Sequence, residues 1–256
     1  MERDYKIAAL TRALQVLKLF DEDSKRMTLT ELSQKAGINK SSMLRILTSF
    51  EAEGFIRYDA DRKQYSLGIE IFKLANTAYE FVGIQELAYP YIRNAVEETG
   101  LIGHLGAVED GHVVIISKVW PKSMTDTLVM QSRIGGVVPM HCTGVGKVLA
   151  AFSDHEQLER MLALCDFHRY TDKTLCSREA LLPVLQKVRA QGYAVNSEEH
   201  EPYIKCVTYP IFDYNNRIVA AMSLTGIPQM YGPEKEAQVH KVLKSTVRLI
   251  SNELGR

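Results

Sequence analysis

The sequence has no long apolar run and few cysteines. No stretch of about 18 consecutive apolar residues occurs, so we expect no membrane-spanning helix and no membrane contact. The N-terminus, MERDYKIAAL, is charged and lacks the apolar core and small-residue cleavage site of a signal peptide. The protein is therefore expected in the cytoplasm, where its thiols stay reduced. Its four cysteines form no CxxC pair, which argues against structural disulfides: Cys142, Cys165, Cys176 and Cys206.

The chain also lacks a net charge, because its 31 basic and 31 acidic residues balance. No global field draws it toward nucleic acid or a membrane, so any such binding depends on a local patch. What is present is an ordinary globular composition, with 46% hydrophobic and 24% charged residues. A length of 256 residues suits one large domain or two smaller ones.

The first 68 residues have the pattern of three helices followed by a hairpin. Leu10, Leu14 and Leu17 share one face of the first helix. Thr28 and the glutamate three residues later form a capping-box pattern, and Gly37 suits the end of the helix that follows. This order is typical of a winged helix-turn-helix, whose second helix enters the major groove of DNA. The elements are expected at 7–20, 29–36, 40–53 and 55–67.

Polar side chains gather at the start of the third expected helix, whereas its apolar positions, Leu44 among them, face a three-helix core. A recognition helix needs such a polar face to reach base edges, and basic residues on the hairpin can contact phosphates. Residues 25–67 carry eight basic and five acidic side chains, a modest positive excess that favours DNA binding as a dimer. The alternative is a winged helix that serves only protein contacts. The candidate DNA-binding residues are Asn39, Lys40, Ser41, Ser42 and Arg45 on the helix, and Arg57, Arg62 and Lys63 on the hairpin.

The remainder of the chain mixes strands with helices in blocks, and this favours an α+β domain around an antiparallel sheet. Turn residues at 109–111 and 215–216 each join two strand patterns and predict hairpins. The segment 127–132, TLVMQS, predicts a further strand. Residues 69–82 predict a helix with apolar side chains on more than one face, which favours an interface. These side chains are Ile69, Phe72, Leu74, Ala75, Tyr79 and Phe81.

The segment 141–147, HCTGVGK, raises the question of a phosphate-binding loop. Such a loop needs the pattern G-x4-G-K-[ST], but His141 replaces the first glycine and Val148 replaces the final hydroxyl residue. A helix that opens after Thr143 still presents free backbone N–H groups, which favour a small anion. The alternative is that the two glycines only permit close packing, with Lys147 solvated.

Three segments of the sequence are similar to one protein family. IclR-family bacterial transcription regulators carry the pattern P-L-H-x-T-A-x-G-K-A-L-L-A, which resembles PMHCTGVGKVLAAFS. Their helix-turn-helix resembles LTELSQKAGINKSSMLRILTSFEAEGFI, and their C-terminal strands resemble GYAVNSEEHEPYIKCVTYPIFDYNNRIVAAMSLTG. Together these segments extend the resemblance along nearly the whole chain. Residues 171–193 and 209–224 look most similar to the KdgR-like regulators of sugar-acid catabolism.

The resemblance implies an α+β architecture in three parts. A winged helix-turn-helix DNA-binding domain is expected at 1–68, a linker helix at 69–83, and a GAF-like effector-binding domain with an antiparallel sheet at 84–256. The family also implies a homodimer or tetramer on a palindromic double-stranded DNA operator. We accordingly expect a repressor of a catabolic operon that responds to a small carboxylate, such as a sugar acid.

The resemblance also places the effector pocket. The loop 143–146 lines this pocket in the family, and four polar strand positions of the family match this chain. Their amide, thiol and hydroxyl groups form directional hydrogen bonds without a fixed negative charge. They suit a hydroxylated acid whose carboxylate lies at the start of the helix. The main departure is Asn196, where the family has an acidic residue. The expected effector-binding residues are Thr143, Gly144, Val145, Gly146, Asn196, Cys206, Ser223 and Thr225.

An enzyme is the alternative function, with Cys142 or Cys206 as a nucleophile acting on a small carboxylate. Adjacent His141 and Cys142 side chains diverge and no third orienting residue is identifiable, so we predict no enzyme. A buried strand thiol is the alternative for Cys206. The candidate zinc ligands are His141, Cys142, His200 and Cys206. They lack short paired spacings, and no metal or cofactor is expected. The charged cluster at 198–201 is expected to be a solvated strand end or an interface.

Overall fold

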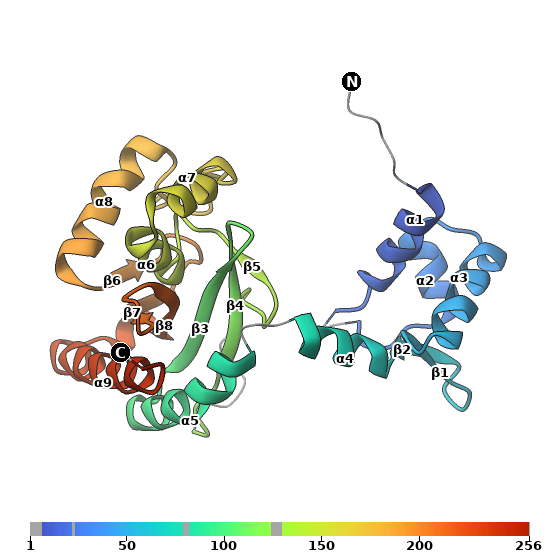
Figure 1. Cartoon of the computed structure of the whole chain (residues 1–256), viewed down its shortest axis with the longest axis horizontal. Helices are drawn as coiled ribbons and strands as arrows, with labels where there is room; N and C mark the ends of the chain where they lie inside the picture. The colour runs from blue at the N-terminus through green and yellow to red at the C-terminus, as the bar shows by residue number, and fades with distance from the viewer. Residues whose placement is uncertain (1–6, 22–23, 79–81, 124–129, 256) are drawn as a thin grey trace. The chain divides into compact units, whose positions relative to one another are not determined.

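The computed structural model describes residues 7–21, 24–78, 82–123 and 130–255 (Figure 1). The chain divides into two compact units, Met1–Glu80 and Phe81–Arg256. No helix among the described residues is long and apolar enough to cross a membrane.

The N-terminal unit contains a helical triplet, a small hairpin and a fourth helix (Figure 1). Thr28 Oγ1 accepts a hydrogen bond from the Glu31 N–H at 3.3 Å, and the Glu31 carboxylate accepts one from the Thr28 N–H at 2.7 Å. The predicted capping box is therefore confirmed. Gly37 ends this helix with a φ of 64°, which favours glycine. The elements are α1 (Ala8–Leu17), α2 (Leu29–Ala36), α3 (Lys40–Ala52), β1 (Ile56–Asp59), β2 (Gln64–Leu67) and α4 (Ile69–Ala78).

The core of the N-terminal unit joins one face of each helix of the triplet to the hairpin. Val16 of α1 is fully buried within it. The face of α1 that carries Leu10 and Leu14 is not covered in this unit, since these side chains are 56% and 48% exposed. The prediction that Leu44 faces the core is also wrong, because it is 44% exposed. Other buried core residues are Leu32, Met43, Leu47, Ile56 and Tyr65.

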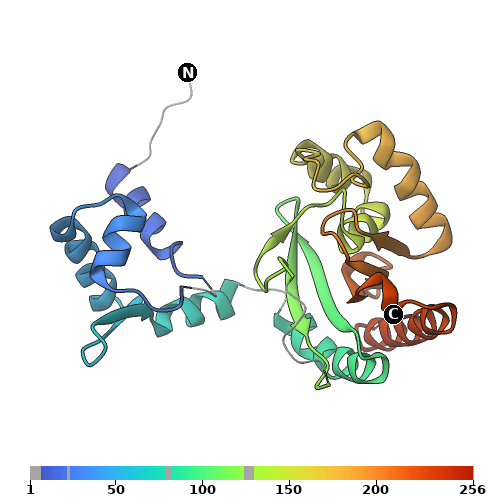
Figure 2. The same ribbon diagram turned by 180° about the vertical axis from the view of Figure 1, so that it is seen from behind.

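The C-terminal unit, in the part that the structure describes, has a six-stranded antiparallel sheet in the order β5-β4-β3-β8-β7-β6. Helices α5 and α9 pack on one face, and α6, α7 and α8 pack on the other (Figures 1 and 2). The predicted α+β class is confirmed. The strands are β3 (Ile102–Glu109), β4 (His112–Val119), β5 (Val137–Val138), β6 (Ala194–Ser197), β7 (Lys205–Phe212) and β8 (Ile218–Gly226). The helices are α5 (Val82–Thr99), α6 (Gly144–Phe152), α7 (His155–Ala163), α8 (Arg178–Gln191), the short η1 (Pro228–Met230) and α9 (Pro233–Glu253).

Both predicted hairpins of this unit are confirmed. Asp110 and Asn216 have positive φ in the turns that join β3 to β4 and β7 to β8. The predicted strand at 127–132 is wrong for residues 130–132, which form no strand, while 127–129 lie outside the described residues. The edge strand is β5 instead, whose Val138 pairs with Val113. Tyr79 and Phe81 of the predicted interface helix, and the side chain of Ala75, also lie outside the described residues.

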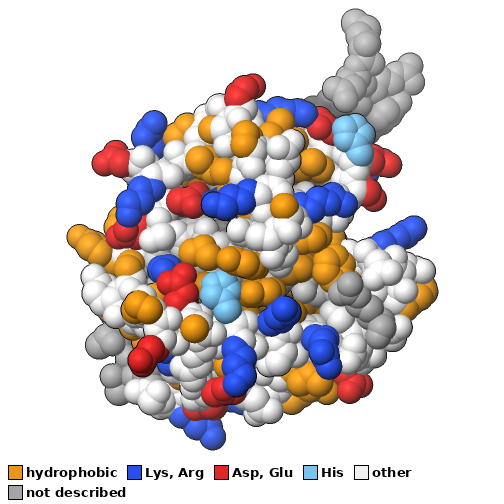
Figure 3. Space-filling view, turned by 90° about the vertical axis from the view of Figure 1, so that its left-hand side faces the viewer, with side chains coloured by type: hydrophobic (Ala, Val, Ile, Leu, Met, Phe, Trp, Pro, Cys, Tyr) orange, Lys and Arg blue, Asp and Glu red, His pale blue; other side chains and the backbone are white. Residues whose placement is uncertain are grey.

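Figure 3 shows the side of the C-terminal unit that carries α8 and α9, where hydrophobic side chains gather in a band between charged ones. A groove between the end of α8 and α9 is lined by Tyr193, Tyr209 and Phe212. The two tyrosine rings stack with 5.3 Å between centroids, and the Tyr209 hydroxyl lies 2.9 Å from His240 Nδ1.

Candidate nucleic-acid interface and ligand pocket

Helix α3 presents an exposed polar surface at its start. Asn39 is the N-cap, and its Oδ1 accepts hydrogen bonds from the Ser42 N–H at 2.9 Å and the Ser41 hydroxyl at 2.7 Å. These bonds fix the first turn of the helix and occupy the Asn39 carbonyl. Lys40 and Arg45 are exposed, and neither forms an ion pair within the described residues. Both cations are therefore available to a partner.

The exposed surface of α3 extends beyond the predicted residues. Thr48, three residues after Arg45, is exposed beside it, because residues three apart are neighbours on a helix. Leu44 adds an exposed apolar group that can contact a thymine methyl. The sequence did not predict the exposure of Leu44, because this residue directly follows the buried Met43 in the apolar pattern.

The β1–β2 hairpin exposes Arg57, Arg62 and Lys63, as predicted for a wing. Asp59 Oδ1 accepts a hydrogen bond from the Arg62 N–H at 3.1 Å. Asp59 Oδ2 lies 3.9 Å from Arg62 Nε and 3.5 Å from Arg26 Nη1. Asp59 thus offsets part of the positive charge, whereas Arg57 and Lys63 form no ion pair in the described part of the chain.

A small pocket lined by both polar and apolar side chains lies at the start of α6, and we term it the inner pocket. Its volume is about 60 Å³, and residues 142–145 and strands β3, β6, β7 and β8 contribute to its lining. Gly146 does not line this pocket. A Cβ at Gly146 would lie 2.4 Å from the Met140 carbonyl oxygen. This glycine therefore permits close packing. The other seven predicted effector-binding residues line the pocket: Thr143, Gly144, Val145, Asn196, Cys206, Ser223 and Thr225.

Thr143 and Asn196 hold the loop before α6. Thr143 Oγ1 accepts a hydrogen bond from the Gly146 N–H at 3.1 Å and donates one to the Pro139 carbonyl at 2.7 Å. Asn196 Nδ2 donates to the Cys142 carbonyl at 2.7 Å. A carboxylate at position 196 could not donate this bond. The departure at Asn196 thus has a structural role, in addition to its place in the pocket lining.

His104 of β3 connects the floor of the inner pocket to the segment that follows β4. Its Nδ1 lies 3.2 Å from Thr225 Oγ1, and its Nε2 lies 3.1 Å from Ser132 Oγ. Burial, with a smaller effect from Lys118, lowers the pKa of His104 to about 3. The ring therefore stays neutral and can both donate and accept a hydrogen bond. His104 was not among the effector-binding residues predicted from the sequence; the available signal was one polar residue in the apolar strand LIGHLGAV.

The chemistry of the inner pocket favours binding over catalysis. Burial, and then Glu199, raises the pKa of the Cys142 thiol to about 12, and burial raises the pKa of Cys206. Protonated thiols are poor nucleophiles. No lysine or arginine occurs among the described residues that line the pocket, and Glu201 is the one carboxylate among them. The backbone N–H groups at the start of α6 add partial positive charge at one end of the pocket, an arrangement that suits a small anion.

Lys147 lies inside the unit, one turn after the pocket. Its side chain is 2% exposed and forms an ion pair with Glu199, whose side chain is 14% exposed. The alternative of a solvated Lys147 is therefore wrong. Of the two expectations for the cluster at 198–201, a solvated strand end or an interface, the solvated one is wrong for Glu199. A buried lysine requires such a partner, because an isolated charge is costly to remove from water.

The segment 198–201 is held in place by two hydroxyl groups. Thr171 Oγ1 donates to the Glu198 carbonyl at 2.7 Å, and Thr174 Oγ1 donates to the Glu199 carbonyl at 2.6 Å. The segment is thus fixed against both α6 and residues 171–174. The residues that it brings to the inner pocket are His200 and Glu201.

The residues considered as zinc ligands do not form a metal site. Within the described ranges, no group of three or more His, Cys, Asp or Glu side chains could hold a metal ion. Both ring nitrogens of His141 have protein partners: Nε2 lies 3.0 Å from the His168 carbonyl oxygen, and Nδ1 lies 3.3 Å from Cys165 Sγ.

The two units together define a class of protein. A winged helix-turn-helix with available cations, in one chain with an α+β unit that encloses a polar pocket, is the plan of a ligand-responsive DNA-binding regulator. The family model for the IclR helix-turn-helix domain matches residues 9–60. The model for the C-terminal domain of the bacterial transcriptional regulator IclR matches residues 77–252. The chain therefore belongs to the IclR family of bacterial transcriptional regulators, which confirms the resemblance seen in its sequence.

Characterised relatives match most or nearly all of the chain. The HTH-type transcriptional regulator KdgR of Escherichia coli K12 is 31% identical over 249 residues, covering 97% of this chain and 93% of KdgR. The transcriptional repressor IclR of the same organism is 31% identical over 222 residues, covering 86% of this chain and 80% of IclR. The structure of Thermotoga maritima IclR is 28% identical, with a TM-score of 0.79 over 96% of this chain and 98% of that chain. The family consists of regulators and not enzymes, so the alternative of catalysis by Cys142 or Cys206 is set aside.

Proposed function

We propose that this chain is a repressor of a catabolic operon that binds a palindromic DNA operator and responds to a small carboxylate, such as a sugar acid. The inner pocket carries the proposal, because a helix N-terminus there faces a floor of neutral hydrogen-bonding groups. The likeness to KdgR and to a relative named as a repressor supports it. In this proposal residues 1–68 bind DNA in the cytoplasm, 69–83 form a linker helix and 84–256 bind the effector.

The proposed DNA contacts divide by element. The start of α3, from Asn39 and Lys40 through Ser41 and Ser42 to Arg45, faces base edges in the major groove. Arg57, Arg62 and Lys63 of the wing contact phosphates, which position the domain without reading sequence.

A homodimer or a tetramer formed from it provides the second half-site. Two recognition helices then lie about 34 Å apart, one turn of DNA, or at a multiple of that distance. Exposed apolar side chains on α1 and α4 support a dimer, since monomers rarely leave such surfaces uncovered. They include Ile7, Leu10, Leu14, Ile69 and Phe72, which are 48–68% exposed.

The proposed effector lies with its carboxylate at the N–H groups of residues 144–145 and its hydroxyl groups toward Ser223 and Thr225. His104 reads a hydroxyl group through its bond to Thr225, because the neutral ring can take either hydrogen-bonding role. A pocket of about 60 Å³ is small for a sugar acid, so the wall at residues 130–141 has to move outward to admit one. This requirement gives the effector a different affinity for two arrangements of the unit, which is the basis of a regulatory response.

Removal of the hydroxyl pair tests this assignment. A thermal-shift screen of short hydroxy acids and sugar acids first identifies the acid that stabilises the protein. Ser223→Ala with Thr225→Val is expected to lower the affinity for that acid about tenfold, since each lost hydrogen bond contributes roughly 0.5–1.5 kcal/mol. Operator affinity in a gel shift without effector stays unchanged. Ser245→Ala, on the surface of α9, is the control. A double variant that still responds normally would place the effector elsewhere.

A further inference from the structure

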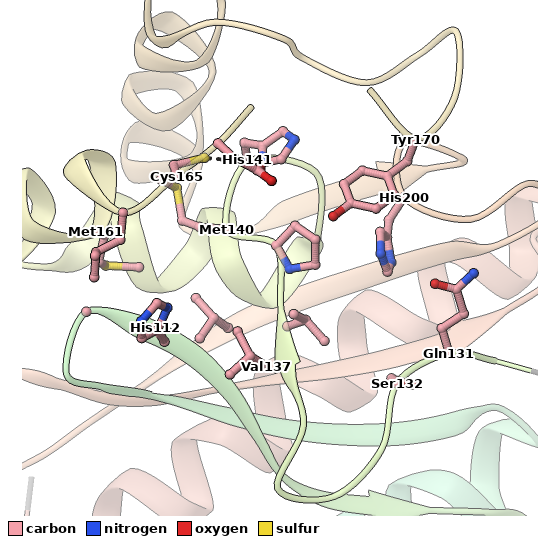
Figure 4. Close-up of a pocket in the computed structure, with 16 residues that line it drawn as sticks. His112, Gln131, Ser132, Val137, Met140, His141, Met161, Cys165, Tyr170 and His200 are labelled. Carbon is pink, nitrogen blue, oxygen red and sulfur yellow. Dashed lines mark hydrogen bonds between the residues drawn. The ribbon is translucent and has the colours of Figure 1, made fainter. Parts of the chain in front are cut away.

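A second cavity lies beside the inner pocket, and we term it the outer pocket (Figure 4). Its volume is about 360 Å³, compared with about 60 Å³ for the inner pocket. Small-molecule sites in proteins typically measure about 300–1,000 Å³. The outer pocket thus has the size of a ligand site. Its lining comes from residues 111–113, 131–132, 137–141 and 164–166, and from Met161, Tyr170 and His200.

The floor of the outer pocket is apolar and its rim is polar. Val113, Val138 and Met161 are buried side chains of the floor. The hydroxyl of Tyr170 points toward the cavity (Figure 4), and it has no hydrogen bond to any described residue. The side-chain amide of Gln131, also on the rim, likewise has none within the described ranges. An apolar ring fits such a floor, and its polar substituents meet unpaired groups at the rim.

The charges around the outer pocket do not favour an anion. Among the described residues that line it, none is lysine or arginine, Asp166 is the one carboxylate, and three are histidines: His112, His141 and His200. Helix α7 ends at Ala163, just before Leu164 and Asp166 of the lining, so its C-terminal carbonyl groups add partial negative charge there. The inner pocket has the start of a helix at one end, whereas the outer pocket has the end of one, so an acid would lose hydration here without meeting free N–H groups of a helix start.

Neighbouring rings hold the polar wall of the outer pocket in place. The Tyr170 ring meets those of His168 and His200 edge-on, at 4.8 and 4.7 Å between centroids. The His141 ring is held by its bond to the His168 carbonyl and by its contact with Cys165, drawn in Figure 4. Side chains that are already ordered lower the entropic cost of binding a ligand.

We propose that the outer pocket binds a small aromatic molecule that carries hydroxyl or amine groups and no acid group. Its ring lies against the apolar floor, a hydroxyl group bonds to Tyr170, and an amine lies near Asp166. This ligand differs in charge from the acid proposed for the inner pocket and goes beyond the proposed function. Ser132, Val138 and His200 line both pockets, which places the second ligand where it can change the affinity for the first.

Isothermal titration of the full-length protein with tyramine tests this proposal. We expect saturable binding of tyramine. The acid 4-hydroxyphenylacetate has the same ring with a carboxylate in place of the amine, and in the same titration its affinity should be at least about fivefold lower than that of tyramine. Tyr170→Phe is expected to lower the affinity for tyramine about three- to tenfold, which is the effect of one lost hydrogen bond. The matched control is Tyr214→Phe, at a tyrosine that is 70% exposed and lines neither pocket.

Further variants separate the two pockets and guard against misfolding. Ser223→Ala, in the inner pocket, should leave tyramine binding unchanged. Gln131→Ala changes the same rim at an exposed position and replaces Tyr170→Phe if that variant has a lowered melting temperature. The proposal is overturned by absence of saturable tyramine binding at millimolar concentration, or by an affinity for the acid equal to that for tyramine. It is also overturned if Ser223→Ala abolishes tyramine binding while both rim variants retain it.

Discussion

The polar side chains at the candidate sites divide according to the bonds that they already make. Asn39 caps α3 and Asn196 holds the Cys142 carbonyl, so both stabilise the local backbone. Lys40 and Arg45 form no ion pair within the described part of the chain, so they keep their charge for a partner. Substitutions of the first pair should therefore change stability, and substitutions of the second pair should change binding.

Arg45→Ala is expected to weaken the operator complex by about 1–3 kcal/mol, the discrimination that one bidentate contact to a base provides. Lys63→Ala, on the wing, should weaken binding to all DNA sequences about equally. It should also reduce the slope of log affinity against log salt concentration by about one. Gel shifts on the operator and on a scrambled duplex, at several salt concentrations, distinguish the two effects. An Arg45→Ala protein with unchanged preference for the operator would exclude base reading by this residue.

His104 gives the protein a stability that depends on pH. Burial lowers its pKa from 6.5 to about 3, so the unfolded chain binds a proton at a higher pH than the folded chain does. The stabilising effect is complete above about pH 6.5 and is lost as the pH falls toward 3, by about 1.4 kcal/mol per pH unit.

His104→Gln should remove this part of the slope in urea unfolding measured between pH 7.5 and 4.5. Some slope remains, because burial also lowers the pKa of His141 and His240. His112→Gln, at an exposed residue, should keep the slope of the wild type. Equal slopes in all three proteins would refute this role of His104.

Helix α6 connects the inner pocket to the segment opposite it. Its first turn lines the pocket, and Lys147, one turn later, pairs with Glu199. The same segment carries His200, which lines both pockets. A change at the start of α6 therefore reaches residues 198–201 through a single buried contact.

Lys147→Met should destabilise the C-terminal unit by about 3–5 kcal/mol, because Glu199 is left buried without a partner. The double variant Lys147→Met with Glu199→Leu should recover most of that loss, since neither charge remains. Trp120 is the one tryptophan of the chain, so its fluorescence in urea reports on this unit. A double variant as unstable as the single one would argue against this account.

Features that depend on neighbouring residues were predicted from the sequence more accurately than the pairing of strands was. The Thr28 cap and the Gly37 helix end depend on residues at most a few positions away, and both were found from sequence. The strand expected at 127–132 was misplaced, because the residue that pairs with Val113 is Val138, and pairing across a sheet leaves no mark in a short apolar run.

Family patterns located most of the inner pocket, since its loop and strands carry recognisable motifs. They did not reveal the pairing of Lys147 with Glu199, because lysine is rarely buried and its partner lies 52 residues away. The outer pocket was also missed. Its lining comes from separate segments that only the fold brings together.

The proposed homodimer requires apolar surfaces that a second copy can cover. Leu10 and Leu14 of α1, and Ile69 and Phe72 of α4, are all about half exposed or more. Binding at a palindrome needs two copies, and the modest positive charge of the N-terminal unit makes a single copy weak. These apolar surfaces are the ones we expect a second copy to cover.

Leu10→Glu with Leu14→Glu should lower the oligomeric state, because burying two carboxylates in an apolar interface is costly. Sedimentation should show a smaller species, and operator affinity should fall at least about tenfold with the loss of the second half-site. Ile134→Glu, at a residue of the C-terminal unit that is 52% exposed, is the control. A double variant that sediments like the wild type would exclude this surface as the interface.

Dissolved ions should affect DNA binding and effector binding differently, because no lysine or arginine occurs in the described lining of the inner pocket. Cations at the operator compete with potassium, so DNA occupancy falls when a cell loses water and its ionic content rises. The interaction of the proposed acid with buried backbone N–H groups is screened far less. Osmotic stress would therefore shift how much promoter is occupied while leaving the metabolite threshold where it was.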